Sequence, residues 1–141
     1  MAVARVFNAH PTRQVRTEPI VRYVRRILRA EGYPRGEVAV VAVDSRFCRR
    51  LNRRYLGHDR ATDVISFVIE KGVLLQGEVY VNLDRARSQA REYGVPEVHE
   101  LARLVIHGTL HLVGYDDRDT RRARRMKAAE ERHLAHWFKT R

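Results

Sequence analysis

The sequence lacks the features of secreted and membrane proteins. Its only cysteine is Cys48, so the chain cannot form an internal disulfide, which fits a reducing compartment. No apolar run approaches the roughly 20 residues that a membrane-spanning helix needs. The first ten residues, MAVARVFNAH, lack the apolar segment and the cleavage site of a signal peptide. We therefore expect a cytoplasmic protein with no membrane partner.

The sequence also lacks internal repeats, low-complexity stretches and linker-like segments. Its 141 residues are enough for one domain with a modest hydrophobic core. With 44% hydrophobic and 32% charged residues, the composition is that of a globular protein rather than a disordered one. We expect residues 1–141 to form a single domain.

Acidic residues and lysine are scarce. There are 17 Asp and Glu against 28 Lys and Arg, for a formal net charge of +11, and the only lysines are Lys71, Lys127 and Lys139. Arginine offers a planar fork of donors that suits phosphate and also stacks on bases. The excess of arginine therefore favours a nucleic-acid partner. The alternative explanation is a solvated surface that reflects an arginine-favouring genome or selection for thermal stability.

The hydrophobic pattern predicts an α+β fold, in which a small mixed β-sheet packs with about five helices. The expected strands cover residues 2–8, 37–43, 63–69 and 77–81. The expected N-caps of four helices are Thr17, Asp44 or Ser45, Asn82, and Asp119 or Thr120, and Pro96 opens the remaining helix.

Two segments of this pattern are unusually apolar. The run 37–43 is continuous, which is typical of a central strand covered on both faces. Nearly every residue from Leu101 to Val113 is apolar, which predicts a helix buried on most sides.

This apolar helix carries two histidines, and the stretch 107–117 reads HGTLHLVGYDD. Residues four apart lie roughly 40° apart around a helix and about 6 Å apart along it, so His107 and His111 can bind one metal ion. Gly114 allows the chain to reverse, and the pattern HxxxHxxGxxD parallels the metzincin pattern HExxHxxGxxH. In that alignment Asp117 takes the place of the third ligand. Two imidazoles and one carboxylate leave a coordination position for water, as in catalytic zinc sites.

The parallel with the proteases is incomplete. Gly108 stands where they carry the glutamate that acts as general base. A metallopeptidase is therefore a weaker interpretation of the motif. Two histidines and a carboxylate also suit non-haem iron, although the order of helix and turn favours zinc.

Several polar residues are candidates for a cleft beside the metal. Thr62, Asp63 and Ser66 either line that cleft or simply cap the start of a strand. Asp116 either hydrogen-bonds a ligating histidine as an outer partner or caps a turn. His133 and His136 are three residues apart on the last helix, where we expect an ordinary packing or surface role.

Three blocks of the sequence together resemble the YbeY family of bacterial endoribonucleases. The string 107–117 is similar to the family signature, a His-Gly pair and a second histidine four residues on, followed by Gly-Tyr-Asp-His. LNRRYLGHDRATDVISF (51–67) resembles the block that usually ends in Thr-Asp-Val-Leu-Ser-Phe, and GEVYVN (77–82) resembles the Gly-Asp-Ile strand block. The resemblance covers the chain from about residue 45 to the C-terminus.

Two positions depart from the family pattern. The usual third histidine is Asp117 here, a ligand that zinc accepts but that changes the charge of the site. The family commonly has an arginine, implicated in catalysis, where this chain has Leu56. Arg53, Arg54 and Arg60 are nearby in the sequence and could supply that positive charge to RNA.

The resemblance implies an endoribonuclease that uses one Zn²⁺ per chain and a metal-bound water to cleave single-stranded RNA. Its expected role is rRNA processing, especially maturation of the 16S rRNA 3′ end, and ribosome quality control, with rRNA and the small ribosomal subunit as partners. The general base and the oligomeric state are left open. The alternative, favoured by Gly108 and Leu56, is an RNA-binding ribosome-assembly factor whose metal is mainly structural.

Overall fold

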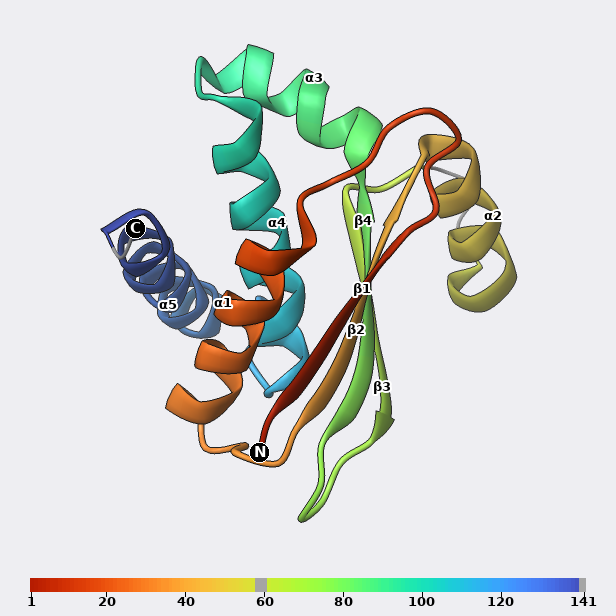
Figure 1. Ribbon diagram of the computed structural model, residues 1–141. Coiled ribbons are helices and arrows are strands. Elements are labelled where there is room, and N and C mark those ends of the chain that lie inside the picture. The colour runs from red at the N-terminus through yellow and green to blue at the C-terminus, as the bar shows by residue number, and fades with distance from the viewer. Residues whose placement is uncertain (58–60, 140–141) are drawn as a thin grey trace.

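The computed structural model describes residues 1–57 and 61–139, shown in Figure 1. Within these residues the elements follow the order predicted from the sequence. They are β1 (Val3–Asn8), α1 (Thr17–Ala30), β2 (Glu37–Val43), α2 (Ser45–Leu56), β3 (Val64–Glu70), β4 (Gln76–Asn82), α3 (Leu83–Tyr93), α4 (Glu97–Leu112) and α5 (Thr120–Lys139).

The four strands form one mixed sheet in the order β1-β2-β4-β3. β2 pairs in parallel with both β1 and β4, whereas β3 runs antiparallel to β4 and forms an edge of the sheet. The predicted α+β class with a small mixed sheet and five helices is confirmed for the described residues. β2 is an inner strand, as its continuous apolar sequence predicted.

The two faces of the sheet differ in their cover. α1, α3, α4 and α5 lie on one side of the sheet, and α2 lies on the other (Figure 1). Along β2, Val38, Val40 and Ala42 are buried toward the helices; of the alternate side chains, Glu37, Ala39 and Val41 are only partly buried and Val43 is buried. The expectation that 37–43 is covered on both faces is therefore wrong, because α2 alone lies on the second side. We call this second side the open face; Phe7 and Ile69 remain exposed on it.

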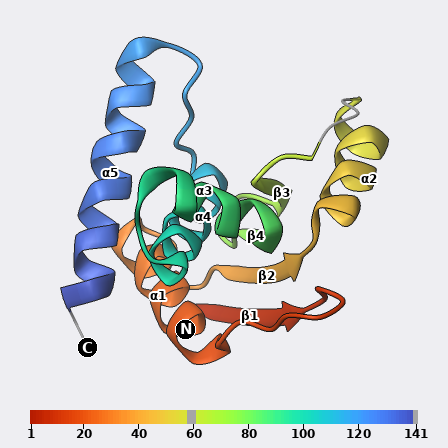
Figure 2. The same cartoon turned by 90° about the horizontal axis from the view of Figure 1, so that it is seen from above.

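α4 is buried between the sheet and the other helices, as its apolar sequence predicted. Figure 2 shows α4 between the sheet and α5. Gly108 is the point of closest approach to the sheet. A Cβ atom there would lie 2.5 Å from Val79 Cγ1 and 2.9 Å from Val64 Cγ2. The absence of a side chain at residue 108 therefore allows the histidine-bearing turn to sit directly on β3 and β4.

Side-chain caps define most helix starts. Asp44 accepts a hydrogen bond from the Phe47 backbone N–H, and Asn82 accepts from the backbone of Asp84 and Arg85. Asp119 accepts from the backbone N–H of Arg122 at 2.8 Å. These caps satisfy N–H groups that have no partner within the helix.

The first helix departs from its expected cap. α1 already includes Thr17, so Arg16 occupies the N-cap position and provides no side-chain hydrogen bond. The prediction of Thr17 as N-cap was wrong by one residue, a shift within the usual spread of helix ends.

None of the helices in residues 1–57 and 61–139 is long and apolar enough to cross a membrane.

Candidate active site

The two histidines of α4 face each other at the C-terminal end of the helix. Their Nε2 atoms are 3.1 Å apart, and their ring centroids are separated by 4.7 Å with nearly perpendicular planes. Both rings are partly buried. The four-residue spacing therefore brings the two rings together, as helix geometry predicted.

The two rings have different partners. His107 Nδ1 lies 2.8 Å from Glu130 Oε2, so this nitrogen carries a proton and donates a hydrogen bond to the carboxylate. In the neutral ring the Nε2 atom of His107 is then unprotonated, and it faces Nε2 of His111. A hydrogen bond with the Tyr115 backbone raises the pKa of His111.

This arrangement fits a bound metal ion. An unprotonated imidazole nitrogen can bind a metal, and the two Nε2 atoms are 3.1 Å apart. Two nitrogen ligands at the usual zinc distance and tetrahedral angle would lie about 3.3 Å apart. Burial lowers the pKa of His111, and the neighbouring His107 lowers it further. His111 is thus held neutral, the form that binds metal.

The third ligand is not assembled around the two histidines. Among the residues that the structure describes, no three His, Cys, Asp or Glu side chains come close enough together to hold an ion. Asp117 is exposed in the turn after α4, lines a cavity together with His107, and raises the pKa of His111 by its charge. The structure therefore places Asp117 near the histidines but outside bonding distance of a common ion.

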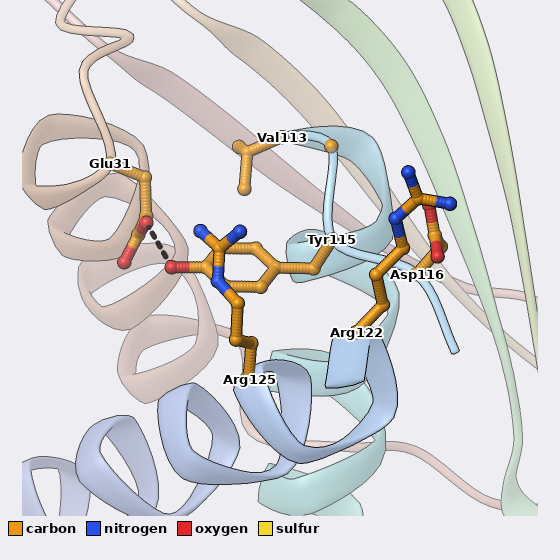
Figure 3. Close-up of a pocket in the computed structure, with 7 residues that line it drawn as sticks. Glu31, Val113, Tyr115, Asp116, Arg122 and Arg125 are labelled. Carbon is orange, nitrogen blue, oxygen red and sulfur yellow. Dashed lines mark hydrogen bonds between the residues drawn. The ribbon is translucent and has the colours of Figure 1, made fainter. Parts of the chain in front are cut away.

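Gly114 and Tyr115 hold the turn that carries Asp117. Gly114 has a φ of 109°, which reverses the chain directly after α4. The Tyr115 hydroxyl donates to Glu31 Oε1 at 2.8 Å, and His133 donates to Glu31 Oε2 at 2.9 Å. Figure 3 shows the dashed bond between Tyr115 and Glu31. The turn is thus anchored to the end of α1 and, through His133, to α5.

Asp116 caps this turn. It accepts a hydrogen bond from the Arg118 backbone N–H at 3.2 Å and pairs with the Arg118 guanidinium at 3.1 Å. Of the two roles that the sequence allowed, turn capping is the one seen. The outer partner of a site histidine is Glu130 instead.

Glu130 belongs to a chain of charged side chains that crosses from α5 to α4. It accepts hydrogen bonds from His107 and, at 3.3 Å, from Arg103. Arg103 also bonds the buried Glu100, with its Nε 2.8 Å from Glu100 Oε1. Burial alone would raise the pKa of Glu130, but the bond from His107 and the charge of Arg103 lower it. Glu130 is therefore a fixed carboxylate that holds the His107 ring in place.

Sequence reasoning missed this role of Glu130. It lies 23 residues from His107 and belongs to another helix, so no local spacing connects the two. A glutamate on the inward face of a helix next to a metal motif was the only available signal.

A cavity of about 490 Å³ opens beside the two histidines, between α4, β3 and the end of α2. Three of its lining residues are Thr62, Asp63 and Ser66, for which the sequence allowed either a place in the cleft or a strand cap. Leu56, which stands at the family's arginine position, also lines it. We call this space the histidine cavity.

Backbone and side-chain bonds fix the walls of the histidine cavity. The buried Asn82 side chain donates to the Thr62 carbonyl at 3.0 Å, and the Asn82 backbone N–H donates to the Asp63 carbonyl at 2.9 Å. Ser66 Oγ donates to the Gly108 carbonyl at 2.8 Å, which ties β3 to the histidine helix. These bonds fix the position of segment 62–66 relative to the histidines of α4.

The arginines near this cavity are only partly described. The Arg54 guanidinium lies 5.4 Å from the centroid of the Tyr55 ring, on the exposed end of α2. Arg60, which the sequence suggested as an RNA contact, lies outside the described residues.

The chain is similar to known proteins in sequence and in fold. The family model described as "Endoribonuclease YbeY" matches residues 5–138. The "Endoribonuclease YbeY" of Chlorobium phaeobacteroides is 38% identical over 123 residues, which cover 87% of this chain and 89% of the relative. The protein of the same name from Chlorobium luteolum is 40% identical over 120 residues, covering 85% and 88%. A solution structure of a Thermotoga maritima protein matches with a TM-score of 0.68 at 25% identity, covering 96% of this chain and 89% of that one.

Proposed function

The chain belongs to the YbeY family of endoribonucleases and is thus an RNA-hydrolysing enzyme, and from this premise we propose that it cleaves single-stranded RNA with one zinc ion. His107 and His111 would hold the ion through their Nε2 atoms, and Asp117 would supply the third ligand. A bound zinc ion lowers the pKa of water and offsets negative charge on a phosphoryl oxygen.

The observation that carries this proposal is the pair of Nε2 atoms 3.1 Å apart on one face of α4, with the His107 ring oriented by its bond to Glu130. Both histidines line the histidine cavity, so an ion held between them would be accessible to a phosphate group. Asp117 is close enough for its charge to act on His111.

The protein's own residues would bind and orient the RNA. Glu130 holds the His107 ring, and the segment that carries Thr62 and Asp63 forms the opposite wall of the histidine cavity. The net charge of +11 favours a polyanionic substrate. We propose Arg54 as a contact for the RNA backbone, because its guanidinium lies on the exposed end of α2 next to that cavity.

We further propose that the substrate is ribosomal RNA in the cytoplasm, with maturation of the 16S rRNA 3′ end and ribosome quality control as the cellular roles. The support is family membership together with the basic surface. The small ribosomal subunit would then be the partner that presents the RNA.

A specific observation favours a second candidate, an RNA-binding assembly factor whose metal is mainly structural. Leu56 presents an apolar, half-exposed side chain to the histidine cavity, where the family pattern has an arginine implicated in catalysis.

A peptidase is disfavoured by Gly108. This residue packs against Val79 of the sheet, so a glutamate could not be placed there without moving the helix.

The experiment combines elemental analysis with RNA cleavage on the same samples. The purified protein is compared with His111→Ala and Asp117→Ala, and His136→Ala serves as control because this histidine is exposed on α5. We expect near-stoichiometric zinc and cleavage of a single-stranded RNA, both lost in the first two variants and retained in the control. Zinc without cleavage in the unmodified protein would support the assembly factor. Absence of zinc would overturn the metal site.

A further inference from the structure

α2 carries a dense positive charge and is only lightly packed. Its sequence, SRFCRRLNRRYL, contains five arginines and no acidic residue. Only Cys48 and Asn52 of this helix are buried. It lies alone on the open face of the sheet (Figure 1). A helix with this charge and so little buried surface is suited to contact a polyanion.

An unbroken row of aromatic rings runs between α2 and the open face. Phe47 stacks on Tyr80 with ring centroids 5.8 Å apart, Tyr80 meets Phe67 edge-on at 5.9 Å, and Phe67 meets Tyr55 edge-on at 5.7 Å. The row thus connects α2, β4 and β3, and Tyr55 ends it with 59% of its surface exposed. We call these four residues the aromatic row.

Positive charge lies over both ends of the aromatic row. The Arg50 guanidinium is 5.9 Å from the Phe47 centroid, and that of Arg54 is 5.4 Å from the Tyr55 centroid. One carboxylate lies within the row, that of Glu78, which accepts a hydrogen bond from the Tyr80 hydroxyl. Exposed aromatic rings combined with arginine are the usual components of surfaces that bind single-stranded nucleic acid.

The exposed end of the row is separated from the histidine cavity by the edge strand alone. Side chains alternate across a strand, so Ser66 of β3 faces α4 and bonds Gly108 while Phe67 faces Tyr55. The same separation holds on α2, where Leu56 lines the histidine cavity and the neighbouring Tyr55 joins the aromatic row. A nucleic-acid strand that crosses the edge of the sheet at β3 would therefore contact both the aromatic row and the histidine cavity within a few nucleotides.

We propose that Tyr55 and Phe67, with Arg54 beside them, form a stacking site for an unpaired RNA base whose neighbouring phosphate lies in the histidine cavity. Stacking on a ring requires a base that is free of its partner strand, and every base offers a flat face. The site therefore accounts for selection of single strands without selection of sequence. This inference rests on the proposed function for the position of the phosphate, but base stacking itself can be measured apart from cleavage.

The occupant is RNA rather than a second copy of the chain or another protein. α2 carries five arginines, two of which lie over the aromatic row, and apposing two such helices in a dimer would bring like charges together. Phosphate groups complement this charge while bases occupy the rings.

The test measures the Kd of the zinc-loaded protein for a fluorescent, unstructured 2′-O-methyl oligonucleotide and for a duplex of the same sequence. The 2′-O-methyl groups limit cleavage during the titration. We expect Tyr55→Ala to raise the single-strand Kd about tenfold and to leave the duplex Kd and the zinc content unchanged. Tyr55→Phe keeps the ring and should retain the affinity.

Tyr93→Ala is the matched control. Tyr93 is 56% exposed on α3 and has the Arg103 guanidinium 6.0 Å from its ring centroid, so it resembles Tyr55 in exposure and charge but lies away from the open face. Its substitution should leave both Kd values unchanged.

Three results would overturn the stacking site: an unchanged single-strand Kd in Tyr55→Ala, an equal loss for the duplex, or a change of oligomeric mass in that variant. The proposed function is tested separately by zinc content and cleavage. If neither is found while Tyr55→Ala still weakens single-strand binding, the stacking site is supported and the metal-dependent reaction is refuted. If cleavage depends on His111 but single-strand binding does not depend on Tyr55, the stacking site is refuted and the metal-dependent reaction is not.

Discussion

Replacing Glu130 by Gln should weaken zinc binding without unfolding the protein. The carboxylate accepts the proton of His107 Nδ1 at 2.8 Å, and this bond directs Nε2 toward His111. Gln has the same shape and can still accept one hydrogen bond, but it lacks the charge that strengthens the bond from an imidazole. Arg103 keeps its bonds to Glu100, so the link between α4 and its charged neighbours persists.

The size of the effect follows from the role of Glu130 as the outer partner of a ligand. Loss of such partners typically lowers metal affinity 10–100-fold, equivalent to about 1.4–2.7 kcal/mol. We expect Glu130→Gln near the lower end, because the amide oxygen still accepts from His107. Glu130→Ala should approach the upper end, since it leaves Nδ1 without its acceptor.

Zinc affinity is measured by competition with a chromophoric chelator, and folding by circular dichroism and the Tm. The control is Glu131→Gln, which makes the same change in charge at an exposed neighbour on α5. Equal loss of affinity in Glu130→Gln and Glu131→Gln would show that only net charge matters and would refute the positioning role. Unchanged affinity in Glu130→Ala would refute it as well.

Three further predictions concern the substrate, the core and the acid side of the stability curve. Leu56→Arg adds a positive charge to the histidine cavity, so it should tighten single-stranded RNA binding and steepen its log–log salt dependence by up to about one unit. Gly108→Ala places a Cβ 2.5 Å from Val79, so overpacking of about 1–3 kcal/mol should exceed the gain in helix propensity of about 1 kcal/mol and lower the Tm in thermal melts. In the control Gly72→Ala no atom lies within 4 Å of the new Cβ, so the Tm should not fall. Burial would raise the pKa of Glu31, but hydrogen bonds from His133 and Tyr115 lower it below 4.5. The contribution of this carboxylate to stability is therefore present above pH 4.5 and is lost as the pH falls through the lowered pKa. The Tm difference between Glu31→Gln and the unmodified protein should be largest near neutral pH and shrink in acid.

The secondary structure was largely accessible from local patterns. Strand 37–43 has the predicted bounds, and Asp44 and Asn82 cap the helices assigned to them. Alternation, helical periodicity and caps depend on neighbouring residues, so they can be recognised without knowledge of the fold. The error at 37–43 was of another kind. An apolar run indicates that a strand is inner, but not whether a second layer covers it.

The candidate site could be predicted only in part from the sequence. The spacing of His107 and His111 on one helix is enough to bring their rings together, because helix geometry alone sets that distance. Asp117 was assigned by analogy with a turn whose real course depends on Tyr115 bonding Glu31 in α1. Gly108 was interpreted as a missing catalytic glutamate, whereas the fold uses this position to bring α4 onto the sheet.

The sequence by itself determined the order of elements, the pair of histidines and the excess of arginine, because each is a property of neighbouring residues or of composition. Only the tertiary structure decided that Glu130 orients His107, that Leu56 faces the histidine cavity and that Tyr55 joins rings from two strands. These contacts join residues that are 10 or more positions apart, and they exist only where packed helices and strands bring distant side chains together. The physical reason is that burial of apolar surface sets how the elements pack, and that packing then fixes which polar and aromatic groups meet.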